Sequence, residues 1–471
     1  MRASFLLTLV RILNYEDVLV TVFSYACACV LQLLSSAITK LSCDAYSRPP
    51  QLPNVKPRLS QRFVELYDKI PQIKEYNRYI DNYGAIDLGR GRPDFLPPTF
   101  VQRALINATS SLDAPIHQSS PSHGEKVLRV ALAELYSELL HRNLSAERNV
   151  LVTSSAVDAL RLALLAYSSS SSSGSDEWIV LEPCPAAYSR LIQSVGAVPV
   201  PLPLRPDHFW SFEPREAARL FGRRTRGVLL ANPSEASGKV LTRRELQFLA
   251  DLASKWNALM LIDESLEFLV YRPARHVRAA AIPRMFQRTI TIGSTADTFA
   301  SSGWPCAWAY GPTRLLNDLK LIQLHVASPP ATPIQIAMAS VIEHRRIFRA
   351  DDPTSYVSRY AHELQQKRDF TVALLTVAGM LPVEPQAGHC ILANWTSLLE
   401  TIELGDADED YRITDWEFAR WLAQRLGVAL MPLSAFYSEN NQQIGRGFVR
   451  FCFAKKQKTL EEAANRLLEL V

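Results

Sequence analysis

The body of the chain alternates between two hydrophobic patterns. Short, nearly continuous apolar runs are typical of buried strands, and they occur at residues 149–153, 177–183, 257–264, 289–292 and 307–310. Apolar residues at three- and four-residue spacing are typical of amphipathic helices, and they occur at residues 61–80, 125–141, 242–256, 322–349, 355–379 and 415–427. Thr242 and Glu245 fit a capping box at the start of one helix, and Gly427 is a stop signal for another.

A separate apolar segment precedes this body. Residues 18–39 contain no charged side chain, and about 20 apolar residues are needed to cross a bilayer. Three interpretations of residues 1–46 stay open: a signal-anchor, a cleaved signal peptide, or a helix packed on the body (or a misassigned start). Basic residues lie on both sides of the run, so its orientation is not resolved. The proline-rich residues 48–57 predict an extended linker or arm.

Length and charge limit the classes to which the chain can belong. Without the N-terminal extension roughly 420 residues remain, which suits a large domain with a smaller one. The formal net charge of +4 does not indicate a nucleic-acid partner. The seven cysteines are scattered without metal-ligand spacing, so we expect buried or free thiols and no metal site.

Residues 289–311 carry the most informative motif. They combine an apolar strand, a turn of small residues, an Asp-Thr-Phe sequence, a Ser/Gly segment and a second strand. The stretch resembles the active-site segment of fold-type I, pyridoxal-phosphate-dependent aminotransferases of class I/II, in which Ser-x-x-Lys-Thr-Phe precedes Gly-Trp and a basic residue. It is most similar to the kynurenine and glutamine transaminase branch, which includes the cysteine-conjugate β-lyases. The residues that fit are Ser294 (a cofactor-binding position of the family), Thr298, Phe299, Gly303 and Trp304.

The same stretch departs from the family at its reactive position. Asp297 stands where the resemblance implies the lysine that forms the Schiff base with the cofactor, and Pro305 stands where it implies a basic phosphate contact. No lysine occurs between Lys255 and Lys320, so the segment offers no other amine. The nucleophile and the base of transamination are therefore both missing from this position.

Further motifs resemble the same family. Residues 86–95 resemble its Leu-Gly-x-Gly-x-Pro-Asp-Phe loop, where Gly91 allows the backbone to approach the substrate closely. Ser155 and Ala156 lie at a strand-to-helix junction that holds the cofactor phosphate in the family, although ordinary N-capping by serine explains them equally. Arg450 matches the arginine that binds the substrate α-carboxylate, and a surface arginine on a strand is the alternative.

Other positions of the implied cofactor site are altered. Asp263 is retained, and the resemblance implies that it pairs with the pyridine nitrogen. Glu235 replaces an asparagine and Leu266 replaces a tyrosine, and both of those family residues contact the phenolic oxygen. Ser119 replaces an aromatic residue that reaches the neighbouring subunit, and Cys184 replaces the phenylalanine that stacks on the ring.

The ordered motifs imply the α/β fold of the fold-type I aminotransferases. We expect a large domain with a mostly parallel central sheet and a smaller α+β domain built from both chain ends. The expected divisions are a hydrophobic extension at 1–46, an arm with part of the small domain at 47–95, the large domain at 96–345 and the C-terminal small domain at 346–471.

The substitutions concentrate at the implied active site, which favours a degenerate aminotransferase with a binding or partner role. Three carboxyl groups would repel a phosphate ester, so we expect pyridoxal phosphate to bind weakly or not at all. Two alternatives stay open: an enzyme of altered chemistry acting on amino acids or 2-oxo acids, and an active kynurenine- or glutamine-type transaminase. The family implies a homodimer, or a heterodimer with a paralogue. It also implies a cytoplasmic location, unless residues 18–39 anchor the chain in a membrane.

Overall fold

The computed structural model describes residues 30, 71–171, 174–400, 402 and 414–470. Contacts divide the chain into Met1–Gln61 and Arg62–Val471, and all described residues except Val30 belong to the second unit. The predicted extension at 1–46, apart from Val30, and the arm up to residue 70 lie outside the described residues. In the described part of the chain, no helix is both long and apolar enough to cross a membrane.

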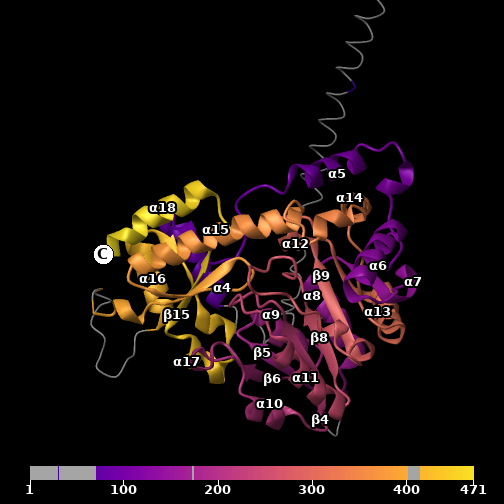
Figure 1. Ribbon diagram of the computed structural model, residues 1–471, viewed down its shortest axis with the longest axis horizontal. Helices are drawn as coiled ribbons and strands as arrows, with labels where there is room; N and C mark the ends of the chain where they lie inside the picture. The colour runs from indigo at the N-terminus through magenta and orange to yellow at the C-terminus, as the bar shows by residue number, and fades with distance from the viewer. Residues whose placement is uncertain (1–29, 31–70, 172–173, 401, 403–413, 471) are drawn as a thin grey trace, which may run out of the picture. The chain divides into compact units, whose positions relative to one another are not determined.

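A seven-stranded sheet forms the centre of the second unit (Figure 1). Its strands, in spatial order, are β2 (Val150–Thr153), β10 (Ala307–Tyr310), β9 (Thr289–Ser294), β8 (Leu259–Asp263), β7 (Thr225–Ala231), β5 (Glu177–Glu182) and β6 (Val198–Pro203). Every neighbouring pair from β9 to β6 is parallel, and β10 is antiparallel to both of its neighbours. The five strands predicted from apolar runs are confirmed.

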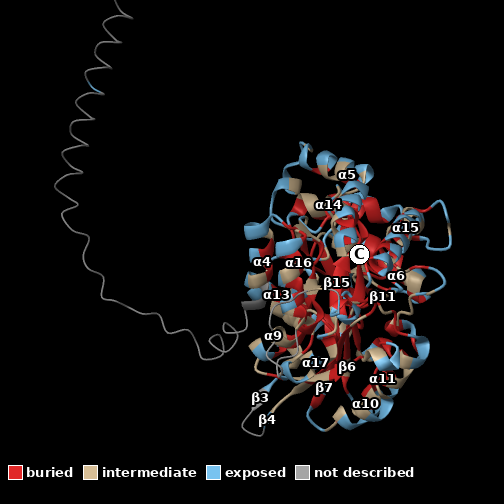
Figure 2. Ribbon diagram, turned by 90° about the vertical axis from the view of Figure 1, so that its left-hand side faces the viewer, coloured by how far each residue is buried: buried red, intermediate tan, exposed pale blue. Residues whose placement is uncertain are grey.

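Helices cover both faces of this sheet, which is why its strands are apolar on both sides. On one face Leu160 packs in a cluster with Leu229, and on the other Leu249 packs in a cluster with Leu230. Figure 2 shows the buried strands between helices whose outer sides are exposed. The helices of this region are α5 (Thr99–Thr109), α6 (Lys126–Leu140), α7 (Ala146–Asn149), α8 (Ala156–Tyr167), α9 (Ala186–Ser194), α10 (Pro214–Leu220), α11 (Arg243–Lys255), α12 (Thr295–Thr298), α13 (Thr313–Val326) and α14 (Thr332–Glu343).

A smaller antiparallel sheet belongs to the C-terminal part of the chain. Its strands, in spatial order, are β11 (Leu381–Val383), β12 (Cys390–Asn394), β15 (Phe448–Cys452) and β14 (Met431–Pro432). Separately, β1 (Ile86–Asp87) pairs in parallel with β13 (Val428–Ala429), so both ends of the described body meet here. The helices of this region are α4 (Pro71–Tyr83), α15 (Tyr356–Val377), α16 (Asp415–Arg425), α17 (Gln442–Gly445) and α18 (Gln457–Leu467). The predicted fold class is confirmed, and the domain boundaries at residues 95 and 345 stay predictions.

The helices predicted at 125–141, 242–256, 355–379 and 415–427 are confirmed; of the helix predicted at 61–80, the described part from residue 71 is helical in α4, and residues 61–70 lie outside the described residues. The helix predicted at 322–349 is wrong, because α13 ends at Val326 and α14 begins at Thr332. Pro329 and Pro330 lie between them; proline lacks the N–H that an α-helix needs and restricts the residue before it. The capping box of Thr242 and Glu245 at the start of α11 is present as predicted.

Candidate functional site

The candidate site lies at the carboxyl ends of β7, β8 and β9. Asp263 is the last residue of β8, and it pairs in register with Ile292 of the neighbouring strand β9. After β9 the chain turns into the short helix α12, which contains Asp297 and which Ser294 caps by accepting a hydrogen bond from the Ala296 N–H at 3.1 Å. In parallel sheets, ligands bind outside this edge, so the position alone suggests a site.

Both oxygens of the Asp263 carboxylate already have partners. Oδ2 accepts a hydrogen bond from the Tyr188 hydroxyl at 2.9 Å. Oδ1 accepts from the N–H and the hydroxyl of Ser265, at 3.0 and 2.6 Å. Burial, together with the nearby Asp263, raises the pKa of Tyr188 well above its usual value, so the phenol stays a donor. Tyr188 was not identified from the sequence, because it lies 75 residues away along the chain.

The Asp297 carboxyl lies in a strongly acidic environment. Burial raises its pKa to about 8, and the charges of Glu235 and Asp263 contribute to the same shift. Solvent still reaches 31% of the side chain, and Oδ1 lies 3.6 Å from Nδ1 of His389. Burial and the charge of Lys455 lower the pKa of His389 to about 4. At neutral pH both groups are therefore mainly uncharged, and their contact is not an ion pair.

Arg450 on β15 presents two free donor groups to this site. Its side chain is 3% exposed, it lies over the Phe436 ring at 4.4 Å, and Nη2 donates to the Gly89 carbonyl oxygen at 2.7 Å. Nε and Nη1 are buried without a hydrogen-bond partner, and the nearest carboxylate is Glu235, with Oε1 at 3.7 Å from Nη1. A buried guanidinium with unused donors is suited to receive a carboxylate.

Gly91, which was predicted to lie near the substrate, lies directly against Arg450. Its φ of +69° belongs to the left-handed region that favours glycine. A Cβ at this position would lie 3.4 Å from the Cys390 sulfur and 3.5 Å from Nη2 of Arg450. The glycine therefore lets the 86–95 loop pass close to the arginine.

The start of helix α8, the predicted phosphate site, is occupied by its own side chains. Ser155 caps the helix by accepting from the Asp158 N–H at 3.0 Å, and the Ser154 hydroxyl donates to Asp158 Oδ2 at 3.1 Å. Asp158 also forms an ion pair with Arg161 at 2.6 Å. Ala156 is the first helical residue. The carboxylate of Asp158 therefore supplies the negative charge that a helix N-terminus favours. A search of the sequence for acidic residues in first turns of helices would have identified it.

The remaining predicted positions contribute little polar chemistry. Leu266 is buried in the apolar cluster of the smaller sheet. Cys184 is buried and lines a small pocket together with Glu235 and Lys239. Pro305 and Ser119 are exposed.

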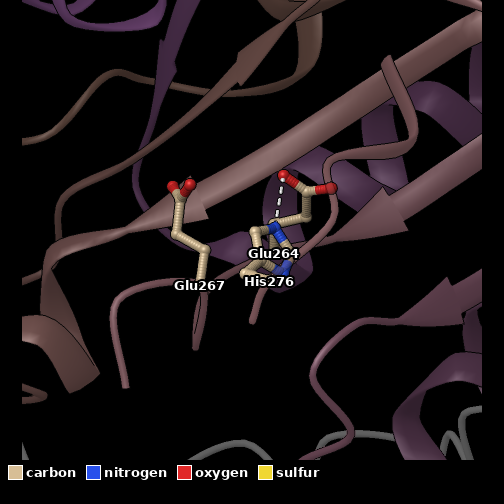
Figure 3. A group of neighbouring side chains, drawn as sticks. All are labelled: Glu264, Glu267 and His276. Atoms are coloured by element: carbon tan, nitrogen blue, oxygen red, sulfur yellow. Dashed lines mark ion pairs between the residues drawn. The ribbon is translucent and has the colours of Figure 1, made fainter. Parts of the chain in front are cut away.

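A second buried polar group lies beside the site, on the segment that follows β8. Glu264, Glu267 and His276 bring their side-chain ligand atoms within 4.8 Å of one another (Figure 3). His276 Nε2 is 3.3 Å from Oε2 of Glu264. Arg278 forms an ion pair with Glu267, so a cation of the chain itself already balances this group. We therefore assign no metal ion to it.

Comparisons with known proteins find similar sequences and similar folds. The family described as aminotransferase class I and II matches residues 83–467. Kynurenine–oxoglutarate transaminase 3 of Mus musculus is 34% identical over 398 residues, covering 83% of this chain and 85% of that protein. Kynurenine–oxoglutarate transaminase 1 of Homo sapiens is 30% identical over 423 residues, covering 87% and 98%. The structure of N-succinyldiaminopimelate aminotransferase from Mycobacterium tuberculosis, 28% identical, has a TM-score of 0.77 and covers 88% of this chain and 100% of that chain.

Proposed function

We propose that this chain, which belongs to the aminotransferase class I and II family, is a degenerate relative of the kynurenine- and glutamine-type transaminases. It keeps the fold and the carboxylate-binding arginine, and it binds an amino acid without transaminating it. One observation carries the proposal: the side chain that α12 places beside Asp263 is the carboxyl of Asp297 and not an amine.

Two lysines of the described chain, Lys239 and Lys455, are already held in contacts. Lys239 lies 3.3 Å from Glu245 in a different loop, and Lys455 donates to the Arg92 carbonyl oxygen at 2.8 Å. An amine that forms a Schiff base must be free to attack and must lose its proton. Both of these amino groups are already held by an oxygen atom of the chain.

The described residues do not fit pyridoxal phosphate, the cofactor that the family implies. Asp263 has both oxygens engaged, and Asp158 adds a carboxylate to the first turn of α8, the helix start that holds the phosphate in the family. Glu235 and Asp263 are acidic groups that repel a phosphate dianion, and about 1.4 kcal/mol of repulsion lowers the affinity tenfold. We propose that the cofactor binds weakly or not at all.

A free amino acid suits what the site retains. Its carboxylate can accept hydrogen bonds from Nε and Nη1 of Arg450, which have none at present. Its ammonium group would then face the Glu235 carboxylate, which favours a cation, and the uncharged Asp297 carboxyl, whose oxygens accept hydrogen bonds. A 2-oxo acid has the same carboxylate but lacks the ammonium group, so we expect it to bind less tightly.

A second candidate is an enzyme of altered chemistry, or a transaminase that obtains an amine elsewhere. The pKa of Asp297, at about 8, favours it, because a group that titrates near neutral pH can act as a general acid or base. Asp263 and Arg450, which are retained, are also compatible with an enzyme that acts on amino acids or 2-oxo acids. Conversion of an amino acid and a 2-oxo acid by the purified chain would establish this candidate.

We further propose that the chain acts as a dimer, with itself or with a paralogue, because the family dimerises across its active sites. A cytoplasmic location follows from the family, unless residues 18–39 anchor the chain in a membrane. Mass photometry of the full chain, alone and after mixing with an active relative, tests the partner.

Calorimetry of the full chain with glutamine, kynurenine and 2-oxoglutarate tests the binding function. We expect an amino acid to bind more tightly than 2-oxoglutarate. Arg450→Gln should weaken that binding at least tenfold, or about 1.4 kcal/mol, while Arg446→Gln, on the exposed surface of the same segment, should leave it unchanged. Equal affinity for the amino acid and the oxo acid, or no effect of Arg450→Gln, contradicts the proposed binding mode.

A further inference from the structure

Two cysteines face each other on the strands that support Arg450. Cys390 begins β12, Cys452 ends β15, and the two are direct partners in the antiparallel register. Arg450 is opposite Leu392 in the same ladder, two residues along each strand. Because side chains alternate along a strand, the two thiols and the Arg450 side chain lie on the same face of the sheet.

The backbone hydrogen bonds identify the type of this cysteine pair. The Phe453 N–H donates to the His389 carbonyl oxygen at 2.9 Å, whereas the Cys452 N–H donates to Leu88 outside the strand pair at 2.6 Å. Hydrogen-bonded and non-hydrogen-bonded pairs alternate in an antiparallel ladder, so Cys390 and Cys452 form a non-hydrogen-bonded pair. In such a pair the Cα atoms are about 4.5 Å apart. That separation lies within the range of roughly 4.4–6.8 Å that a disulfide spans.

The two thiols are free, and their pKa values are shifted in opposite directions. The Cys390 thiol donates a hydrogen bond to the Cys452 sulfur, which lowers the pKa of Cys452, and the charge of Lys455 acts in the same direction. The same hydrogen bond and burial raise the pKa of Cys390. Cys452 is therefore the nucleophile of the pair, since the thiolate is the reactive form.

The Cys390 sulfur lies close to the 86–95 loop, because a Cβ at Gly91 would be 3.4 Å from it. Both cysteines are buried, but Gly91, which covers the Cys390 sulfur, is half-buried between the exposed Arg90 and Arg92.

We propose that Cys390 and Cys452 form a redox modification site. Hydrogen peroxide oxidises the two thiols to a disulfide, which joins β12 to β15 two residues from Arg450. The Cys452 thiolate attacks one peroxide oxygen, the O–O bond breaks, and hydroxide leaves and takes up a proton to form water. The Cys390 sulfur then attacks the oxidised Cys452 sulfur, the S–O bond breaks, and the Cys390 proton leaves in a second water. Two thiols are oxidised by two electrons, and one peroxide is reduced to two waters.

Peptide mass mapping of the full chain tests the site. The reduced protein is exposed to hydrogen peroxide, quenched, alkylated under denaturing conditions and digested without reductant. We expect the peptides of Cys390 and Cys452 to be linked, with a mass two hydrogens below their sum, and two free thiols to be lost per chain. Cys306 is the matched control, because it is equally buried and its pKa is raised to about 12, so it should stay reduced.

Single substitutions separate the two roles. Cys390→Ser should leave Cys452 as a sulfenic acid that dimedone traps, whereas Cys452→Ser should leave Cys390 unmodified. Cys306→Ser should form the same linked peptide as the unaltered chain. The proposal is overturned if the folded protein, judged by circular dichroism, forms no Cys390–Cys452 link at doses that oxidise Cys306. Loss of amino acid binding does not bear on this result, because the assay reads sulfur chemistry alone.

Discussion

Replacing Asp297 with asparagine is expected to change how the stability of the protein depends on pH. The folded chain holds the Asp297 proton up to a pKa of about 8, whereas an ordinary aspartate in the unfolded chain loses it near 3.8. Between these two values the folded state binds one proton more than the unfolded state. The free energy of unfolding must therefore fall as the pH rises through this window, and asparagine removes this contribution.

The size of the effect follows from the same shift. One group that differs by one bound proton changes the free energy of unfolding by at most about 1.4 kcal/mol per pH unit. Solvent reaches 31% of the Asp297 side chain, so we reduce this limit by about half. Between about pH 5.5 and about pH 7.5, the native chain should lose about 1–2 kcal/mol relative to Asp297→Asn.

Urea unfolding of both proteins at the two pH values measures this difference. Asp81→Asn serves as the control, because Asp81 is exposed and lies outside the site. If the native chain and Asp297→Asn keep the same difference in unfolding free energy at both pH values, Asp297 is already ionised. The account of an Asp297 carboxyl whose pKa is raised by burial and by its acidic neighbours Glu235 and Asp263 would then be wrong.

Three further substitutions test the packing and capping around the sheet. Gly124→Ala should destabilise the protein by about 1–3 kcal/mol in urea unfolding, because the new Cβ would lie 2.4 Å from the Cβ of Val152 and the φ of residue 124 is +98°. Gly303→Ala is the control and should be nearly neutral, because no atom lies within 4 Å of its new Cβ. Thr242→Ala removes the capping box of α11 and should cost about 1 kcal/mol, seen as a lower melting temperature in calorimetry. Glu182→Gln replaces a carboxylate that accepts three hydrogen bonds with an amide, and it should lower the free energy of unfolding by about 1–3 kcal/mol in denaturant unfolding. An unchanged free energy of unfolding would contradict this expectation.

Much of the fold could be predicted from local sequence. The strands at 257–264 and 289–292 were evident because strands buried on both faces have continuous apolar runs. The break between α13 and α14 was missed because apolar spacing continues through 322–349, although Pro329 and Pro330 cannot continue a helix.

The candidate site was predicted where a motif places a residue at a strand end, as for Asp263 and Asp297. The structure also brings Gly91 and Arg450 together, from opposite ends of the body. Tyr188 and His389 were not predicted, because their contacts with the two aspartates join segments that are distant in sequence. Such contacts depend on tertiary packing, which no local pattern encodes.

The most direct test of the central claim is an absorbance titration of the full chain with pyridoxal phosphate, followed by borohydride reduction and peptide mapping. The account predicts no Schiff-base absorbance band and no labelled lysine, because Asp297 offers no amine and no lysine lies between Lys255 and Lys320. Asp297→Lys should recover part of the band. A stoichiometric band with one labelled lysine in the native chain would contradict the account and would identify the amine that the site uses.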